Sequence, residues 1–288
     1  MLFSDIQNIF QKDLQNLFPK EEIDQFFFML VEHYFNIARI QLHLDSELTS
    51  SKDEQEQLFS ALDQLKESVP IQYILGETDF YGLTFKLSEA TLIPRPETEE
   101  LVDWIIKDNT SHSNLKVLDI GTGSGCIAIA LAKHLESASV SGVDISSEAL
   151  KCAEVNSNLN NTKVQFSKFD ILNAEKDANF TEQFDIIVSN PPYVRELEKV
   201  EIQPNVLNHE PHSALFVSDD NPLVFYAKIC EFAVENLKPN GQLYFEINQY
   251  LGQEMIALLE LFEFENIELR TDYSGNDRML KAIIPIHI

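Results

Sequence analysis

The stretch that decides the fold reads Asp119-Ile120-Gly121-Thr122-Gly123-Ser124-Gly125. An apolar run at 116–120 predicts a strand before it, and we expect a helix to begin after it at Cys126. The chain has only 9 glycines, and three of them stand at alternate positions in this loop. Glycines permit positive φ and close approach of a ligand, and a helix start offers free N–H groups. The pattern therefore predicts a ligand-binding turn between a strand and a helix.

Acidic residues at the ends of successive strands narrow the class of ligand. Asp119 and Asp144 end the first two predicted strands, and Asp170 follows the third. We expect Asp144 to accept both hydroxyls of a ribose, Asp170 an adenine amino group, and Asp119 to lie close to a cationic amino acid. S-Adenosylmethionine carries these groups and no phosphate, so the acids favour it. A dinucleotide stays open on these residues alone, because the loop holds an alanine-ended variant of its glycine fingerprint, Gly123-Ser124-Gly125-Cys126-Ile127-Ala128.

Outward from this loop, short apolar strands alternate with helices. We expect strands at 116–120, 140–144, 164–169, 184–189 and 242–247, and helices that begin at Cys126, Ser147, Pro222 and Gln249. Strands at 267–270 and 279–285 are expected to pair antiparallel through a turn at 274–277. The alternation predicts an α/β fold with a parallel sheet covered on both faces.

The chain before this sheet divides into two predicted parts. Residues 1–68 read as a small helical bundle, with capping signals at Ser4-x-x-Gln7 and Ser51-x-x-Glu54 and two more helices between 19 and 43. Residues 69–110 read as a connector, with short strands at 71–76 and 79–85 turned at glycines. A helix in the connector is expected to begin at Pro96 and to end near Lys107. Residues 111–288 then form the α/β domain.

Composition excludes several classes of protein. The 288 residues carry 21 Lys plus Arg against 47 Asp plus Glu, a formal charge of −26, which opposes non-specific binding to nucleic acid. Three cysteines without a Cys-x-x-Cys pair argue against a disulfide framework or a zinc cluster. The most apolar run, 26–31, is far shorter than the roughly 20 residues that span a bilayer. We therefore expect a cytoplasmic chain with no membrane partner. We also expect a monomer, although the composition does not bear on this.

The fourth strand of the predicted sheet runs directly into Asn190-Pro191-Pro192-Tyr193. Ligands bind beyond the carboxyl ends of parallel strands, so this turn lies on the ligand side. Neither proline has an N–H, and the segment therefore presents hydrogen-bond acceptors. We expect the Asn190 side-chain oxygen and the Pro191 carbonyl to orient the hydrogens of a planar NH2 group, with Tyr193 stacked on it. Such positioning serves methyl transfer to a poorly nucleophilic nitrogen without a strong general base.

These motifs together resemble one family, the peptide-chain-release-factor glutamine methyltransferases. Asn190-Pro191-Pro192-Tyr193 is similar to the signature of methyltransferases that act on exocyclic or amide nitrogens. The resemblance covers nearly everything from Tyr73 onward, and its specific part is Ile93-Pro94-Arg95-Pro96-Glu97-Thr98-Glu99. Further matching strings are Tyr73-Ile74-Leu75-Gly76, Phe80-Tyr81-Gly82, Asp119-x-Gly121-Thr122-Gly123-Ser124-Gly125, Glu210-Pro211 and Asp277-Arg278.

The resemblance implies a Rossmann-like class I methyltransferase sheet and methyl transfer from S-adenosylmethionine. The acceptor would be the glutamine amide in the Gly-Gly-Gln motif of class-1 peptide chain release factors, which the 1–68 bundle would help to bind. The cofactor site would comprise Asp119, Gly121, Thr122, Gly123, Ser124, Gly125, Asp144, Asp170, Ile171 and Asn190. The glutamine site would comprise Asn190, Pro191, Pro192 and Tyr193, of which Asn190, Pro191 and Tyr193 are the expected catalytic residues.

The chain departs from the family pattern at three places. Ile171 stands where an aromatic residue is common, Glu246-Ile247-Asn248 replaces a Glu-His-Gly sequence, and 219–223 replaces a more glycine-rich turn. Three other functions stay in competition: an amino-nitrogen methyltransferase of RNA or DNA bases, a cofactor-binding adaptor without turnover, and a dehydrogenase. Nucleic-acid enzymes share the Asn-Pro-Pro-Tyr turn but generally lack the string at 93–99 and the helical bundle.

Three remaining candidates have structural readings. Pro211 breaks any helix that would align His209, Glu210 and His212 as metal ligands, so we expect a surface loop there. Cys126 at a helix start is expected to be a small packing residue rather than a reactive thiolate. For Arg95 and Glu97, a helix start and a border of the substrate channel explain the residues equally well.

Overall fold

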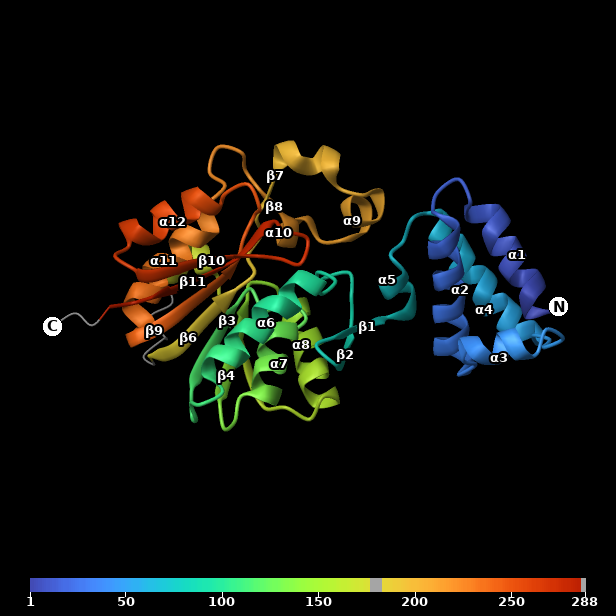
Figure 1. Cartoon of the computed structure of the whole chain (residues 1–288), viewed down its shortest axis with the longest axis horizontal. Helices are drawn as coiled ribbons and strands as arrows, with labels where there is room; N and C mark the ends of the chain where they lie inside the picture. The colour runs from blue at the N-terminus through green and yellow to red at the C-terminus, as the bar shows by residue number, and fades with distance from the viewer. Residues whose placement is uncertain (177–182, 286–288) are drawn as a thin grey trace. The chain divides into compact units, whose positions relative to one another are not determined.

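The computed structural model describes residues 1–176 and 183–285, which form two compact units (Figure 1). The first comprises Met1–Gly76 with Gln203–His209, and the second comprises Glu77–Ile202 with Glu210–Ile288. The domain boundaries that the sequence predicts, after residue 68 and after residue 110, remain predictions.

The first unit is a helical bundle, as predicted. Its helices are α1 (Phe3–Leu14), α2 (Lys20–Phe35), α3 (Arg39–Leu44), α4 (Lys52–Lys66), α5 (Ile71–Leu75) and α9 (Pro204–His209). Apolar side chains at helical spacing on α1, α2 and α4 meet in one buried cluster that includes Phe10, Phe27 and Leu62. Each such side chain contributes roughly 1.5–3 kcal/mol by leaving water.

Only one of the two predicted capping signals acts as a cap. The Ser51 hydroxyl accepts from the Glu54 amide at 3.2 Å, and the Glu54 carboxylate accepts from the Ser51 amide at 2.6 Å. This capping box begins α4 and confirms the prediction. The prediction for Ser4 is wrong, because α1 begins at Phe3 and its N-cap is Leu2, which offers no side-chain acceptor.

The strand predicted at 71–76 is also wrong, because Ile71–Leu75 forms helix α5. The carbonyl of Pro70 accepts from the amides of Tyr73 and Ile74, which closes a helical turn. Ile71, Ile74 and Leu75 pack on the core of the bundle at the i, i+3, i+4 spacing of a helix. The short apolar run is compatible with both periods, and packing against the bundle decides for the helix.

The connector continues as a β-hairpin and a helix. Strands β1 (Glu77–Phe80) and β2 (Leu83–Lys86) pair antiparallel across Tyr81 and Gly82, which both have positive φ, as a type I′ turn requires. Helix α6 (Pro96–Asn109) begins at the proline and carries Glu97 and Glu99 in its first turn. The predicted helix is thereby confirmed, whereas the segment predicted as a strand at 79–85 holds parts of two strands and the turn between them.

The second unit is built on a seven-stranded sheet in the order β10-β11-β9-β6-β3-β4-β5. Its strands are β3 (Lys116–Ile120), β4 (Ser139–Asp144), β5 (Val164–Lys168), β6 (Phe184–Ser189), β9 (Leu237–Glu246), β10 (Glu265–Thr271) and β11 (Asp277–Ile283). Only β11 runs antiparallel to its neighbours, as predicted for the last two strands. The chain proceeds from β3 outward to β5 and then returns to β6 on the other side of β3, which places a topological switch point between β3 and β6.

Helices cover both faces of this sheet and confirm the predicted α/β class (Figure 1). Helices α6 and α7 (Cys126–His134) pack on one face against Val117, Ile186 and Tyr244, and α8 (Ser147–Leu159) packs beside α7. Helices α11 (Val224–Asn236) and α12 (Gly252–Leu261) pack on the other face against Leu118 and Ile187. Neighbouring residues of a strand thus enter different cores, because side chains alternate across a sheet. Shorter elements are η1 (Ile171–Lys176), β7 (Val194–Arg195), η2 (Glu196–Glu201), α10 (His212–Leu215) and β8 (Phe216–Val217).

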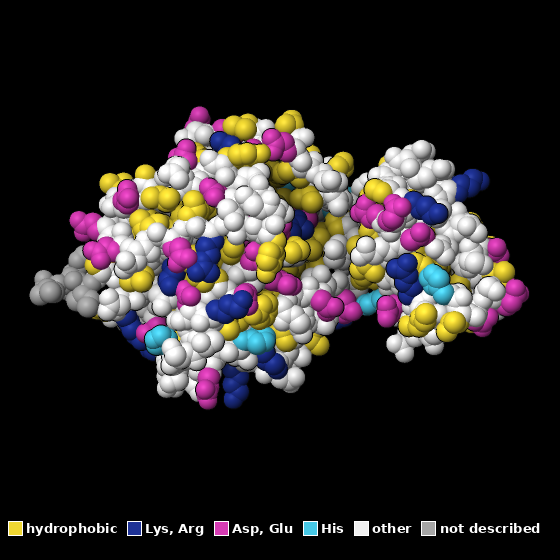
Figure 2. All heavy atoms as spheres, viewed as in Figure 1, with side chains coloured by type: hydrophobic (Ala, Val, Ile, Leu, Met, Phe, Trp, Pro, Cys, Tyr) yellow, Lys and Arg dark blue, Asp and Glu magenta, His cyan; other side chains and the backbone are white. Residues whose placement is uncertain are grey.

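The surface is rich in charge. On the face visible in Figure 2, Asp and Glu side chains are interspersed with Lys and Arg. The outer strands of the sheet, β5 and β10, expose most of their side chains, among them Lys168, Glu265, Glu268 and Arg270. Among residues 1–176 and 183–285, no helix combines the length and apolarity needed to cross a membrane.

Candidate active site

A cavity of about 270 Å³ opens at the carboxyl ends of β3, β4 and β6, at the switch point of the sheet. It is lined by most of the predicted site residues, namely Gly121, Thr122, Gly123, Ser124, Asp144, Asp170, Ile171, Asn190, Pro191 and Pro192. Three predicted residues, Asp119, Gly125 and Tyr193, do not line it. Arg95 and Thr98, from the string at 93–99, complete one wall, whereas Glu97 does not reach it.

Gly121, Gly123 and Gly125 all have positive φ, but their surroundings differ. At Gly121 and Gly123 no atom lies within 4 Å of where a Cβ would be, so the backbone is open to a ligand there. At Gly125 a Cβ would lie 2.9 Å from Ile129 Cδ1 and 3.1 Å from Ala153 Cβ. Gly125 therefore serves close packing at the start of α7, and the other two leave room for a ligand.

Asp119 lies beneath the loop with no exposed surface. Its Oδ2 accepts from the Thr122 hydroxyl at 2.6 Å, while its Oδ1 has no hydrogen-bond partner among the described residues. Burial raises the pKa of this carboxyl to about 7. A buried acceptor without a donor is costly.

Asp144 and Asp170 both organise their own turns. Asp144 accepts from the Gly123 amide at 2.9 Å and from the Ser146 amide at 2.8 Å, which joins the glycine loop to the end of β4. Asp170 accepts from the Leu172 amide at 3.0 Å and from Asn173 Nδ2 at 2.7 Å. Each oxygen of these carboxylates has a second lone pair, so both residues keep acceptor capacity toward the cavity.

Asn190 follows β6 directly and lies on the cavity wall. Its Nδ2 donates to the Thr98 hydroxyl oxygen at 3.2 Å, and the Thr98 hydroxyl donates to Glu246 Oε2 at 2.6 Å. Residues 191 and 192 are prolines and present only carbonyl acceptors. The wall therefore combines a side-chain amide held from behind with a rigid stretch of backbone.

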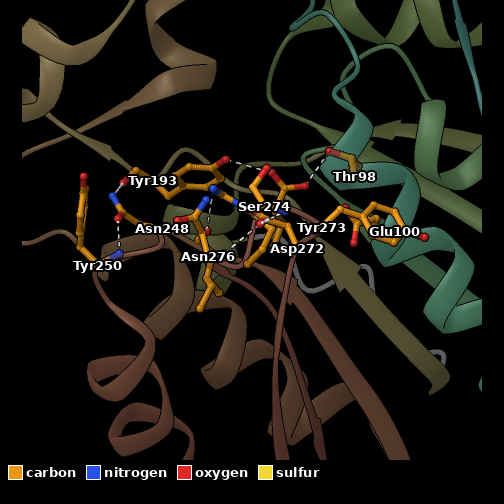
Figure 3. A network of polar contacts seen from close by, with 12 residues as sticks. Thr98, Glu100, Tyr193, Asn248, Tyr250, Asp272, Tyr273, Ser274 and Asn276 are labelled. Atoms are coloured by element: carbon orange, nitrogen blue, oxygen red, sulfur yellow. Dashed lines mark hydrogen bonds and ion pairs between the residues drawn. The ribbon is translucent and has the colours of Figure 1, made fainter.

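Tyr193 does not line the cavity, and Figure 3 shows its side chain in a polar network. Its hydroxyl donates to Glu246 Oε1 at 2.9 Å, and its carbonyl accepts from Asn248 Nδ2 at 3.0 Å. Burial beside Glu246 holds the pKa of the Tyr193 phenol above its ordinary value. The structure does not bring this ring together with the cavity, and its stacking on a substrate stays a prediction.

Sequence reasoning missed three residues that shape the site. Thr98 and Glu246 hold Asn190 from behind, and Glu246 is only 1% exposed. The segment of Glu210 was expected to be a surface loop, which is wrong for Glu210 itself. Its carboxylate is buried, forms an ion pair with Arg95 and accepts from the Ile93 amide at 3.1 Å. The sequence held one signal for Glu210, because the family resemblance includes both the string at 93–99 and Glu210-Pro211. The structure brings these two segments into contact.

The sequence also offered one candidate thiol, Cys126, and one candidate metal site at 209–212. Burial raises the pKa of the Cys126 thiol to about 12, which outweighs the helix start and keeps the thiol protonated. No group of three His, Cys, Asp or Glu side chains is placed to hold a metal within 1–176 and 183–285.

Two family models and several known proteins match this chain. The model of the methyltransferase small domain matches residues 98–213, and that of the PrmC N-terminal domain matches residues 13–76. The release factor glutamine methyltransferase of Flavobacterium psychrophilum is 53% identical over 285 residues, which cover 98% of this chain and 99% of that protein. That of Bacteroides thetaiotaomicron is 42% identical, covering 94% of this chain and 96% of that protein.

A solved structure supports the fold. The 16S rRNA N2 G1207 methyltransferase of Thermus thermophilus, solved with AdoMet and guanosine, aligns with a TM-score of 0.52 and 19% identity. The alignment covers 72% of this chain and 49% of that one. The two relatives are 53% and 42% identical over nearly the whole chain, and the turn Asn190-Pro191-Pro192 lies on the cavity wall. These findings lead to one conclusion. The chain belongs to the release factor glutamine methyltransferase family.

Proposed function

We propose that this chain transfers a methyl group from S-adenosylmethionine to the side-chain amide nitrogen of the glutamine in the Gly-Gly-Gln motif of class-1 peptide chain release factors. Family membership supports the reaction. The observation that carries it is that Asn190, Pro191 and Pro192 line the cavity at the switch point, in a stretch whose two prolines have no N–H. A planar NH2 group is the complement of such a wall.

The residues present fit the cofactor. The unpartnered Asp119 Oδ1 and the carboxylates of Asp144 and Asp170 suit a ligand with a positive charge, ribose hydroxyls and an adenine amino group. Gly121 and Gly123 leave the backbone open, and the buried Ile171 offers an apolar surface to a base. When bound, S-adenosylmethionine supplies an electrophilic methyl group on a sulfonium. Its binding residues are proposed to be Asp119, Gly121, Thr122, Gly123, Ser124, Gly125, Asp144, Asp170, Ile171 and Asn190.

The chain's own contribution to the reaction is to orient the glutamine amide. Asn190 Oδ1 and the Pro191 carbonyl accept its two hydrogens, which aims the nitrogen lone pair out of the amide plane. Orientation of two reactants in this way can supply roughly 7–11 kcal/mol. The proton leaves after the methyl group has been transferred, so a strong general base is not required. We infer that Asn190 and Pro191 touch the reacting amide group. We keep Tyr193, from the same turn, as a proposed catalytic residue that stacks on the planar amide.

We further propose that the helical residues 1–68 help to bind the release factor, and that the protein works in the cytoplasm as a monomer. The formal charge of −26 opposes direct binding to nucleic acid. A base methyltransferase of RNA or DNA shares the turn at 190–193, and it is therefore the alternative that the experiment must separate.

The test uses purified protein, methyl-labelled S-adenosylmethionine and a class-1 release factor. We expect label on the wild-type release factor and none on a Gly-Gly-Gln→Gly-Gly-Ala variant, with ribosomal RNA, tRNA and DNA unlabelled. Asn190→Ala should abolish labelling while cofactor binding, measured by calorimetry, persists. Label on nucleic acid and not on the release factor would establish the alternative. Unchanged methylation by Asn190→Ala would remove the proposed role of this residue.

A further inference from the structure

We propose that Thr98 and Glu246 are positioning residues that fix which end of the Asn190 side-chain amide faces the substrate. The inference rests on the proposed function and adds two residues to its machinery. They come from different elements, since Thr98 lies in the first turns of α6 and Glu246 ends β9. Both are buried, and the Thr98 hydroxyl donates to the Glu246 carboxylate.

The hydrogen bonds behind Asn190 run in one direction. Glu246 Oε2 accepts from Thr98 at 2.6 Å, and Glu246 Oε1 accepts from Tyr193 at 2.9 Å. A carboxylate has no proton to give, so both hydroxyls must donate to it. A threonine hydroxyl has a single proton, and once it is given to Glu246 the oxygen can only accept. The group of Asn190 that faces Thr98 at 3.2 Å is therefore the NH2 group.

This direction determines what the cavity meets. With Nδ2 turned toward Thr98, the remaining end of the Asn190 amide, Oδ1, is the end available to the substrate. An amide turned the other way would present NH2 to the NH2 of glutamine, and two donors cannot bond to one another. Because Asn and its flipped form have nearly the same shape, packing alone does not select between them. The Glu246 carboxylate, which can only accept hydrogen bonds, determines the orientation of the Asn190 amide through Thr98.

Glu246 is itself held in place on several sides. Its backbone carbonyl accepts from the buried Tyr226 hydroxyl at 3.0 Å, and the Arg278 guanidinium donates to the next carbonyl, that of Ile247, at 3.4 Å. The Arg278 guanidinium also bonds to Asp272 at 3.1 Å, within the same network. These bonds fix the backbone at Glu246, and the bond from the Tyr193 hydroxyl to Oε1 holds its carboxylate beside Thr98.

The first experiment removes only the Thr98 hydroxyl. Thr98→Val keeps the shape and frees Asn190 to turn, so we expect kcat for release-factor methylation to fall roughly 10- to 100-fold. Calorimetry should show that the Kd for S-adenosylmethionine changes less than threefold. With S-adenosylhomocysteine present, a Gly-Gly-Gln peptide should bind several-fold more weakly than to wild type. Thr98→Ser restores the hydroxyl and should recover most of both losses.

A matched control and a second variant separate positioning from folding. Thr84→Val removes another hydroxyl that donates to a carboxylate, that of Asp79 at 2.9 Å in the β1–β2 hairpin, and should leave kcat unchanged. Glu246→Gln gives the chain a group that can donate as well as accept, and kcat should fall. If Glu246 acts through Thr98, the double variant Thr98→Val, Glu246→Gln should be no slower than Thr98→Val alone.

The outcomes distinguish this inference from the proposed function. A wild-type enzyme that does not label the release factor defeats the proposed function. An active wild type with a Thr98→Val variant within twofold of its kcat overturns the inference alone. Fully additive losses in the double variant would likewise overturn the role of Glu246 through Thr98.

Discussion

The guanidinium of Arg95 forms an ion pair with the buried carboxylate of Glu210, at 2.5 Å and 115 positions apart in the chain. The other oxygen of that carboxylate accepts from the Ile93 amide. Glu210 thus anchors the segment that carries Pro94, Arg95 and Thr98 to the cavity wall. The wall depends on a residue that lies outside the glycine loop and the catalytic turn.

Glu210→Gln should loosen this anchor. Removing one partner of a buried pair costs up to about 3–5 kcal/mol, and we expect roughly 1–3 kcal/mol here because the Arg95 side chain is 30% exposed. Thermal unfolding measures the stability, and KM for the release factor should rise together with the loss. Glu77→Gln, which breaks the exposed hairpin pair with Lys86, is the matched control and should cost at most about 1 kcal/mol. Equal effects of the two substitutions would contradict the anchor.

The pKa of Asp119, about 7 against an ordinary 3.8, makes stability depend on pH. Between these values the folded state keeps a proton that the unfolded state has released. Asp119 therefore lowers the free energy of unfolding as pH rises from about 4 to about 7. We expect Asp119→Asn to remove this part of the slope and to stabilise the cofactor-free protein at pH 8, on the order of a few kcal/mol.

Denaturant unfolding at pH 5 and pH 8 measures the Asp119 effect. Asn114→Ala, which changes no titratable group, is the control and should keep the wild-type slope. Asp119→Asn should also weaken binding of S-adenosylmethionine at pH 8. A slope unchanged by Asp119→Asn would show that the buried carboxyl is not the titrating group.

The glycines of the loop should fail in different ways when replaced by alanine. Gly125→Ala adds a Cβ 2.9 Å from Ile129 at positive φ, so we expect a loss of stability of about 1–3 kcal/mol. Gly121→Ala meets open space, so it should cost only about 1 kcal/mol while its methyl group obstructs the cofactor. Gly275, far along the chain, also has a positive φ and open surroundings, so Gly275→Ala is the control. This control should match Gly121→Ala in Tm but leave the Kd for cofactor unchanged.

The helical bundle offers a simple test of capping. Ser51→Ala removes the hydroxyl that accepts from the Glu54 amide and should destabilise α4 by about 1 kcal/mol. Ser4→Ala should have little effect, because Ser4 follows the first residue of α1 and does not cap it. Hydrogen exchange of the amides at the start of α4 and of α1 compares the two. Faster exchange in α1 for Ser4→Ala would contradict the assignment.

The central sheet was predictable because its signals are local. Apolar runs such as 116–120 and 184–189 coincide with β3 and β6, and the glycines between β3 and α7 mark their turn. The helix at Ile71–Leu75 was not predictable in the same way, because five apolar-rich residues fit either period until they pack on the bundle. Ser4 failed for a related reason, since a capping pattern does not specify which residue begins the helix.

The candidate site was predictable where it is made of contiguous motifs. The cavity lies where the acids and the turn after β6 were expected to meet, because parallel strands end at one edge. Its supporting residues were not predictable, since Thr98 and Glu246 stand 148 positions apart. No local pattern reports a hydrogen bond of that span. The direction of the Tyr193 ring was not predictable for the same reason, because it depends on a hydrogen bond to Glu246 at the end of β9.

The outer strands of the sheet have a consequence for solubility. A strand at the rim has unpaired backbone groups that can template pairing with another molecule, the first step of fibrous aggregation. Here β5 carries an exposed lysine, and β10 carries exposed glutamates and an arginine. A second copy that added its own rim strand would have to desolvate or pair these charged side chains, which opposes the addition. The sheet is thus protected against edge-to-edge growth by the side chains of its first and last members.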